Sequence, residues 1–219
     1  MNGRFDLGFY GLVCGVTLWL ALLWAGERLK ICRPGRTVKI VLGVATVVLL
    51  FVPAGRLSVW SWAFSICPNP SVPLLGAICA ALWQNLFGVA VFKPADWRAT
   101  WVFGAVAGTL LYLHPLAIGA LDLYFWGWDP VVALSTLAGF AILFLAWGNR
   151  LGVLFFAALL AFELGVLESQ NCWDYAVDPF FWLVSLGFVV ARAIRAWRGG
   201  RVRLAAARTE LVAAASRPA

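Results

Sequence analysis

Two groups of polar side chains in this chain have residue types and spacings suited to acid–base chemistry. The first group is Glu163 and His114, which lie inside apolar segments; His114 is the single histidine of the 219 residues. The second group includes Asp174 and Asp178, in a short segment rich in aromatic residues. A carboxyl in apolar surroundings shifts toward its neutral form and is then suited to proton donation near neutral pH. These four side chains are therefore the candidate catalytic residues.

The same aromatic-rich segments supply candidate substrate-binding residues. Carboxylates beside flat aromatic rings are suited to hold sugar rings or cations, or to stabilise carbocations. An aromatic belt at a membrane–water interface accounts for many of the same rings, so both interpretations stay open. The candidate binding residues are Asp122, Asp129, Glu168, Trp126, Trp128, Trp173, Tyr175 and Arg56.

The elements that must position these side chains are long apolar segments. The chain is 63% hydrophobic and only 12% charged, whereas soluble proteins carry about 25% charged residues. About 20 apolar residues cross the hydrocarbon as a helix, and unpaired backbone amides are excluded from lipid. We predict an all-α integral membrane protein with seven transmembrane helices and a basic tail at 197–219. The predicted spans are 7–25, 40–55, 72–92, 101–121, 131–147, 151–167 and 180–196.

The distribution of cations predicts the orientation of these spans. All 17 lysines and arginines except Arg4 and Arg56 fall in segments that the seven spans place on one side. The side richer in Lys and Arg is cytoplasmic, so the N-terminus is expected outside and the C-terminus inside. The net charge of +7 then serves contact with anionic lipid, and no nucleic-acid partner is expected. We expect a multi-pass protein of a bacterial inner or plasma membrane.

The first span is expected to be retained, because its positive charges follow the apolar stretch, whereas a cleaved signal carries them before it. The second span allows two alternatives. Either a short helix ends by Arg56 and the aromatic segment 57–66 lies along the outer interface, or the helix continues through a kink at Pro53. In the second case Arg56 lies within the membrane and needs a counter-ion.

Glu163 and His114 are expected at similar depth in the membrane. Counted from the cytoplasmic ends of their spans, they lie about 18 Å and about 20 Å deep at 1.5 Å per residue. The pair is then either an acid–base or proton-relay pair, or a hydrogen bond that only joins two helices. Gln84 and Asn85, in the inner half of their span, are expected to hydrogen-bond across helices.

Small and sulfur-containing residues add further predictions. Gly104-x-x-x-Gly108 predicts close packing between helices. A single histidine and the lack of any Cys-x-x-Cys exclude the common zinc patterns. A hard cation held by the outer carboxylates has no support from their spacing, and no nucleotide or phosphate-binding motif is present, so no metal and no cofactor is expected. Cys67 and Cys172 both fall in predicted outer segments, where a disulfide is an alternative to two free thiols.

Three classes of function fit these observations. The first is an integral membrane enzyme that acts on a lipid, polyprenyl, isoprenoid or lipid-linked sugar substrate at the outward-facing carboxylate and aromatic site. The second is a small transporter or carrier of a solute or lipid, for which the inner halves of the spans offer few polar side chains. The third is a noncatalytic membrane subunit or scaffold that binds a membrane-protein partner. The sequence favours the enzyme, with membrane lipid as its surroundings and as its substrate.

Overall fold

A computed structural model describes residues 13, 15–23, 35–66, 70–113 and 122–215. Within these residues the protein is mostly helical, at 78% and with eight α-helices of defined bounds. This confirms the helical character of the predicted fold class. Apolar segments without any charged residue form α3 (Val59–Ile66), α4 (Val72–Phe87) and α7 (Pro130–Ala146), because a helix satisfies its own backbone hydrogen bonds.

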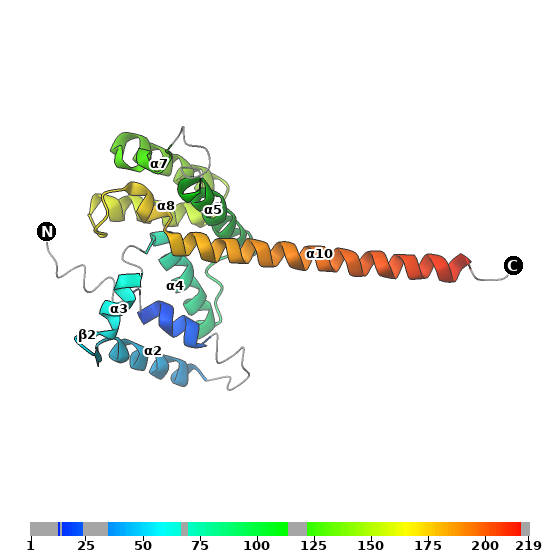
Figure 1. The fold of residues 1–219 in the computed structure, drawn as a ribbon, viewed down its shortest axis with the longest axis horizontal. Coiled ribbons are helices and arrows are strands. Elements are labelled where there is room, and N and C mark those ends of the chain that lie inside the picture. The colour runs from blue at the N-terminus through cyan, green and yellow to red at the C-terminus, as the bar shows by residue number, and fades with distance from the viewer. Residues whose placement is uncertain (1–12, 14, 24–34, 67–69, 114–121, 216–219) are drawn as a thin grey trace.

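The elements follow one another along the chain as helices of very different length, of which α10 is by far the longest (Figure 1). The helices are α2 (Arg36–Leu50), α3 (Val59–Ile66), α4 (Val72–Phe87), α5 (Pro94–Tyr112), α7 (Pro130–Ala146), α8 (Leu151–Glu163), α9 (Cys172–Ala176) and α10 (Pro179–Ala215). A 3₁₀ helix, η1 (Phe125–Trp128), precedes α7. Two short antiparallel strands, β1 (Pro53–Ala54) and β2 (Leu57–Ser58), separate α2 from α3.

Helices α5 and α10 pack side by side in opposite directions. Trp101 stacks on Phe188 at a centroid distance of 4.5 Å, while the Tyr112 hydroxyl reaches the Val177 carbonyl at 2.7 Å. Two glycines of α5 allow this close approach: a Cβ on Gly104 would lie 2.2 Å from Ser185 Oγ. A Cβ on Gly108 would lie 2.5 Å from Trp182 Cβ. The Gly-x-x-x-Gly spacing therefore marks a helix–helix contact, as predicted.

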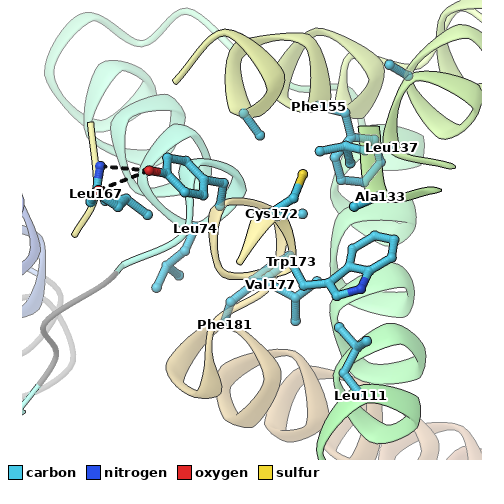
Figure 2. Packing of buried hydrophobic residues seen from close by; sticks show 14 of the residues in the cluster. Leu74, Leu111, Ala133, Leu137, Phe155, Leu167, Cys172, Trp173, Val177 and Phe181 are labelled. Atoms are coloured by element: carbon cyan, nitrogen blue, oxygen red, sulfur yellow. Dashed lines mark hydrogen bonds between the residues drawn. The ribbon is translucent and has the colours of Figure 1, made fainter. Parts of the chain in front are cut away.

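The buried core lies where α7, α8, α9 and the start of α10 converge (Figure 2). Leu137, Phe155 and Phe181 are all fully buried there, at 0% exposed. Gly148 has a φ of 64° in the turn between α7 and α8, a conformation that glycine adopts without strain. The tight turn brings α7 and α8 together as an antiparallel pair.

Apolar side chains also cover the outside of the bundle. Ile142 on α7 and Leu160 on α8 are each 61% exposed, and Leu183 on α10 is 56% exposed. Among the described residues, one helix is long and apolar enough to cross a membrane: the Pro179–Gly199 part of α10, with a mean hydropathy of 1.5. Three shorter apolar helices are Val72–Phe87, Pro130–Ala146 and Leu151–Glu163.

The second predicted span is a short helix followed by a separate aromatic helix. Helix α2 ends at Leu50, and the β1–β2 hairpin then turns through Gly55, whose φ is 74°. Pro53 lacks an N–H donor and Gly55 is in the left-handed region, so the helix does not continue. Arg56 is exposed on this turn. Of the two alternatives, the structure has the short helix.

Two other helix ends differ from the predicted spans. Helix α8 stops at Glu163, and Gly165 follows with a φ of 59°, which ends the helix before residue 167. Helix α10 continues through the predicted basic tail to Ala215, because residues 197–215 contain no proline and are rich in alanine and arginine. The tail is thus an extension of the last helix.

Candidate functional site

Asp178 joins the N-terminal ends of two helices. Its Oδ1 accepts hydrogen bonds from the backbone N–H groups of Phe180 and Phe181, at 2.7 and 2.9 Å, in the first turn of α10. Its Oδ2 accepts the N–H of Ser71, the residue before α4, at 2.7 Å. Aspartate before a proline at the first helical position is the preferred start of a helix. One carboxylate therefore satisfies donors of α4 and α10 together.

Asp178 has little surface left for a substrate, since its side chain is 1% exposed. Burial raises the pKa of its carboxyl, and the backbone N–H donors of Ser71, Phe180 and Phe181 oppose that rise by stabilising the charged form. Both carboxylate oxygens already accept hydrogen bonds from the protein.

Asp174 lies in the first turn of α9 and binds two hydroxyl groups. The Tyr124 hydroxyl donates to its Oδ1 at 2.8 Å, and the Ser169 hydroxyl donates to its Oδ2. Burial raises the pKa of Asp174, and the two hydroxyl donors act in the opposite direction. Burial and the Asp174 charge raise the pKa of Tyr124 as well. Asp174 is only partly buried, so it is the predicted acid with both a shifted pKa and a remaining accessible surface.

Hydrogen bonds from Asn171 and Trp173 hold the segment before α7 against the start of α9. Asn171 is fully buried; its Nδ2 donates to the Tyr124 carbonyl at 3.0 Å, and its Oδ1 accepts the Trp173 N–H at 2.9 Å. The Trp173 indole N–H donates to the Leu123 carbonyl at 3.1 Å. The predicted binding residue Trp173 thus fastens two chain segments.

Tyr175 also serves the fold. Its hydroxyl donates to the Leu167 carbonyl at 3.0 Å and accepts the Leu167 N–H at 3.1 Å (Figure 2). The side chain is 1% exposed, and its ring lies edge-on to Phe162 at 5.2 Å. This predicted binding residue is therefore held inside the core.

The other predicted binding residues lie toward the surface. Asp129 caps α7, where its Oδ1 accepts the N–H groups of Val131 and Val132 at 3.0 and 3.2 Å. Asp122 accepts the Phe125 N–H at 3.1 Å. Trp126 and Trp128 are 45% and 52% exposed, and Glu168 and Arg56 are exposed.

The predicted pairing of Glu163 with His114 is not tested, because His114 lies outside the described residues. Glu163 is exposed and is the last residue of α8. Burial raises the pKa of the Cys172 thiol to about 11, and the nearby charge of Glu163 makes a smaller contribution in the same direction. Cys172 is a free, buried cysteine, and Cys67, its predicted disulfide partner, lies outside the described residues.

The opposite end of the bundle has its own buried carboxylate, which the sequence reading missed. Asp96 is 1% exposed; its Oδ2 accepts the Lys93 N–H at 2.8 Å, and its Oδ1 accepts the Arg150 N–H at 3.2 Å. It joins the starts of α5 and α8. The Lys39 ammonium donates to Asn85 Oδ1 at 2.6 Å and links α2 to α4, so the predicted cross-helix role of Asn85 is confirmed.

Ser71, Ser169, Asn171 and Tyr124, at the end of the bundle that holds Asp178, were missed as well. Local signals existed for two of them: asparagine before a short run with an acid in its first turn, and serine before a run with a proline in its first turn, are both typical of a helix start. Within the described parts of the chain, no three His, Cys, Asp or Glu side chains are grouped to hold a metal ion. No family model, no curated protein and no solved structure matches this chain.

The raised pKa of Asp174 predicts a pH dependence of stability. The folded pKa exceeds the ordinary value of 3.8, so the folded protein holds this proton more tightly than the unfolded chain. This proton contributes fully to the stability of the folded protein when the pH is below the pKa of Asp174 in the unfolded chain. The contribution is lost as the pH rises through the pKa of Asp174 in the folded protein. We expect the melting temperature of the native protein to decline from pH 4 upward more steeply than that of Asp174→Asn. The melting temperatures are measured by tryptophan fluorescence in detergent, with Asp122→Asn as the matched control. Parallel pH profiles of the melting temperature for the native protein and Asp174→Asn would contradict the prediction.

Proposed function

We propose that the chain is a seven-span membrane protein with its N-terminus outside and its basic C-terminal end in the cytoplasm. The long-range polar contacts support this topology, because each joins residues that the cation distribution assigns to the same side. The outer pairs are Asp178 with Ser71 and Asp174 with Tyr124, and the inner pairs are Asp96 with Arg150 and Lys39 with Asn85. A wrongly assigned side would put partners on opposite faces of about 30 Å of hydrocarbon.

The lateral surface supports the same proposal. Helices α4 and α7 and residues 151–162 of α8 contain no charged residue, and large apolar side chains are exposed along them. A helix that is apolar on all sides is either buried in a large core or spans a membrane. These helices are shorter than about 20 residues, so the bilayer is expected to thin around them.

Reporter fusions test the topology. We expect alkaline phosphatase fused after Trp128 to be active, since that position is assigned to the outside, and a fluorescent protein fused after Ala219 to fluoresce in the cytoplasm. The exchanged fusions, with each reporter at the other position, are the controls and are expected to be silent. Activity of one reporter at both positions would overturn the seven-span assignment.

Within this architecture we propose a noncatalytic subunit or scaffold of a larger membrane assembly. The observation that carries the proposal is that three carboxylates of the predicted outer site bind the protein's own backbone. Asp178 accepts three N–H groups while 1% exposed, and Asp129 and Asp122 accept N–H groups at helix starts. A general acid must come within hydrogen-bond reach of its substrate, which the burial of Asp178 opposes.

The second candidate is the membrane enzyme that acts on a lipid, polyprenyl, isoprenoid or lipid-linked sugar substrate. One observation favours it: Asp174 combines partial exposure, a raised pKa and contacts with two hydroxyl groups. In this candidate the neutral Asp174 carboxyl donates the proton, with Tyr124 and Ser169 holding it in place.

Extraction into native lipid nanodiscs separates the two candidates. For the scaffold we expect particles whose protein mass exceeds one chain of 23.9 kDa, for the native protein and for Asp174→Asn alike. Particles with a single chain and no other protein would overturn the scaffold proposal. If the chain is the enzyme, we expect overproduction of the native protein to change the lipid composition of the host, as measured by mass spectrometry of a lipid extract. Overproduction of Asp174→Asn at an equal level is expected to leave that composition unchanged.

A further inference from the structure

Two cationic residues meet at the end of the bundle that holds Asp96. Lys93 precedes α5 and Arg150 precedes α8, and their backbone N–H groups donate to the two oxygens of the same Asp96 carboxylate, at 2.8 and 3.2 Å. Both cationic side chains are exposed. One buried carboxylate therefore places Lys93 next to Arg150, although the two residues are far apart in the chain.

The surface around these two residues has more positive charge than the protein balances. In the segments 88–100 and 143–155, which contain both cations, Asp96 is the only acidic residue. Asp96 is 1% exposed, and its two oxygens already accept the two N–H groups. Neither Lys93 nor Arg150 has an ion-pair partner among the described residues. Exposed cations without exposed acids beside them attract an anionic ligand.

An exposed apolar strip on α8 begins beside Arg150. Val153 and Leu160 are 54% and 61% exposed, and at about 3.6 residues per turn they lie on the same side of the helix as Arg150. The distance along α8 from Arg150 to Leu160 is about 15 Å at 1.5 Å per residue, which is half of the hydrocarbon thickness of about 30 Å. The strip is therefore as long as the acyl region of one membrane leaflet.

A tryptophan lies where the strip meets the cations. Trp147 ends α7 in the turn just before Arg150, and it is 70% exposed. Tryptophan is typical of the border between hydrocarbon and lipid headgroups. The order along this surface is thus an exposed tryptophan and two cations, followed by apolar side chains.

This order favours a phospholipid as the ligand. A free phosphate would leave Val153 and Leu160 uncovered, and a water-soluble protein or nucleic acid does not reach a strip at the depth of the hydrocarbon. The ammonium group of a zwitterionic lipid would find no exposed carboxylate in these segments, whereas the lipids of the cytoplasmic leaflet include anionic ones. We propose that Lys93 and Arg150 bind the phosphate of one anionic phospholipid, with an acyl chain along α8; this rests on the proposed membrane architecture.

Titration of the full chain in detergent with phosphatidylglycerol, followed by native mass spectrometry, tests the site. We expect one tightly bound lipid, with an affinity that falls about fivefold in Arg150→Gln and about 30-fold when Lys93→Gln is added. Both variants keep the backbone N–H groups that bind Asp96, so their melting temperatures without lipid are expected to match that of the native protein. Arg150→Lys, which keeps the charge, is expected to retain the affinity.

Arg56→Gln is the matched control, since it removes an exposed arginine far from Asp96 in the chain. It is expected to leave the affinity for phosphatidylglycerol unchanged. Equal losses for Arg56→Gln and Arg150→Gln would overturn the proposal, because they would show attraction to the net charge alone.

Two further probes identify the kind of ligand. We expect phosphatidylcholine to bind several-fold more weakly than phosphatidylglycerol, and millimolar inorganic phosphate to leave phosphatidylglycerol bound. Equal affinities for the two lipids would overturn the choice of an anionic lipid. Displacement by inorganic phosphate would overturn lipid as the ligand.

The reporter fusions keep this inference separate from the proposed topology. Fusions that behave as expected, together with unchanged lipid binding in the double variant, would overturn the lipid site alone. Fusions that fail, together with lipid binding that depends on Lys93 and Arg150, would overturn the seven-span topology and leave the lipid site in place.

Discussion

Replacing Asp178 with alanine is expected to lower the free energy of unfolding by about 3 kcal/mol or more. The change removes a helix cap, worth about 1–2 kcal/mol. The capped donors are the N–H groups of Phe180 and Phe181. The change also leaves the buried N–H group of Ser71 without its acceptor, at about 1–3 kcal/mol. Denaturation followed by the fluorescence of the 13 tryptophans measures the loss.

Asp129→Ala is the matched control for this prediction. Asp129 also caps a helix, but it is exposed and accepts N–H groups of α7 alone. Water can replace its carboxylate, so we expect a loss of about 1 kcal/mol. Equal losses for the two variants would mean that the link from Asp178 to Ser71 contributes nothing. Asp178→Asn is expected to fall between them, because the amide keeps one acceptor oxygen.

The second large effect is expected at Gly152, where α8 passes closest to α7. A Cβ at this position would lie 2.6 Å from the carbonyl oxygen of Ala141 and 2.8 Å from the backbone nitrogen of Leu145. Backbone atoms cannot move aside as a flexible side chain can, so Gly152→Ala must push the two helices apart. Forcing extra atoms into a packed contact costs about 1–3 kcal/mol, and we expect the upper end.

Gly139→Ala supplies a control of opposite sign. It lies in the middle of α7, and a Cβ there would meet nothing within 4 Å. Alanine is favoured over glycine inside a helix by about 0.8–1.0 kcal/mol. We therefore expect Gly139→Ala to raise the melting temperature and Gly152→Ala to lower it in the same detergent. A decrease of similar size in both would show that α7 and α8 do not pack as described.

The Asp178 prediction bears on the end of the bundle where α4, α9 and α10 begin. Asp178, Asn171 and Tyr175 each tie segments that are separate in the chain, so the loops before α4, α7 and α10 form one hydrogen-bonded unit. Such a hydrogen-bonded unit can hold helix faces in a fixed arrangement for a partner, which agrees with the proposed scaffold role.

Residue types and local spacing were enough to determine the helical class and several contacts of this protein. Apolar runs without charges predict helices, because only a helix satisfies the backbone in apolar surroundings. Gly104 and Gly108 predict a close helix contact, and Asn85 a hydrogen bond across helices. Asp178 before Pro179 was also readable as a helix start, since capping depends on neighbouring residues alone.

The tertiary structure alone decided what the acids bind. An aspartate in a polar loop has the same local pattern whether it faces a substrate or its own backbone. Its role depends on a partner that is distant in the chain: Ser71 lies 107 residues from Asp178, and Tyr124 lies 50 residues from Asp174. It also decided that α2 ends before Arg56 and that α10 runs on to Ala215. Whether a segment forms a helix depends on its composition, whereas the residue at which the helix ends depends on turns and packing. The sequence therefore determined which segments are helical, and the folded contacts determined what the polar residues at the helix ends bind.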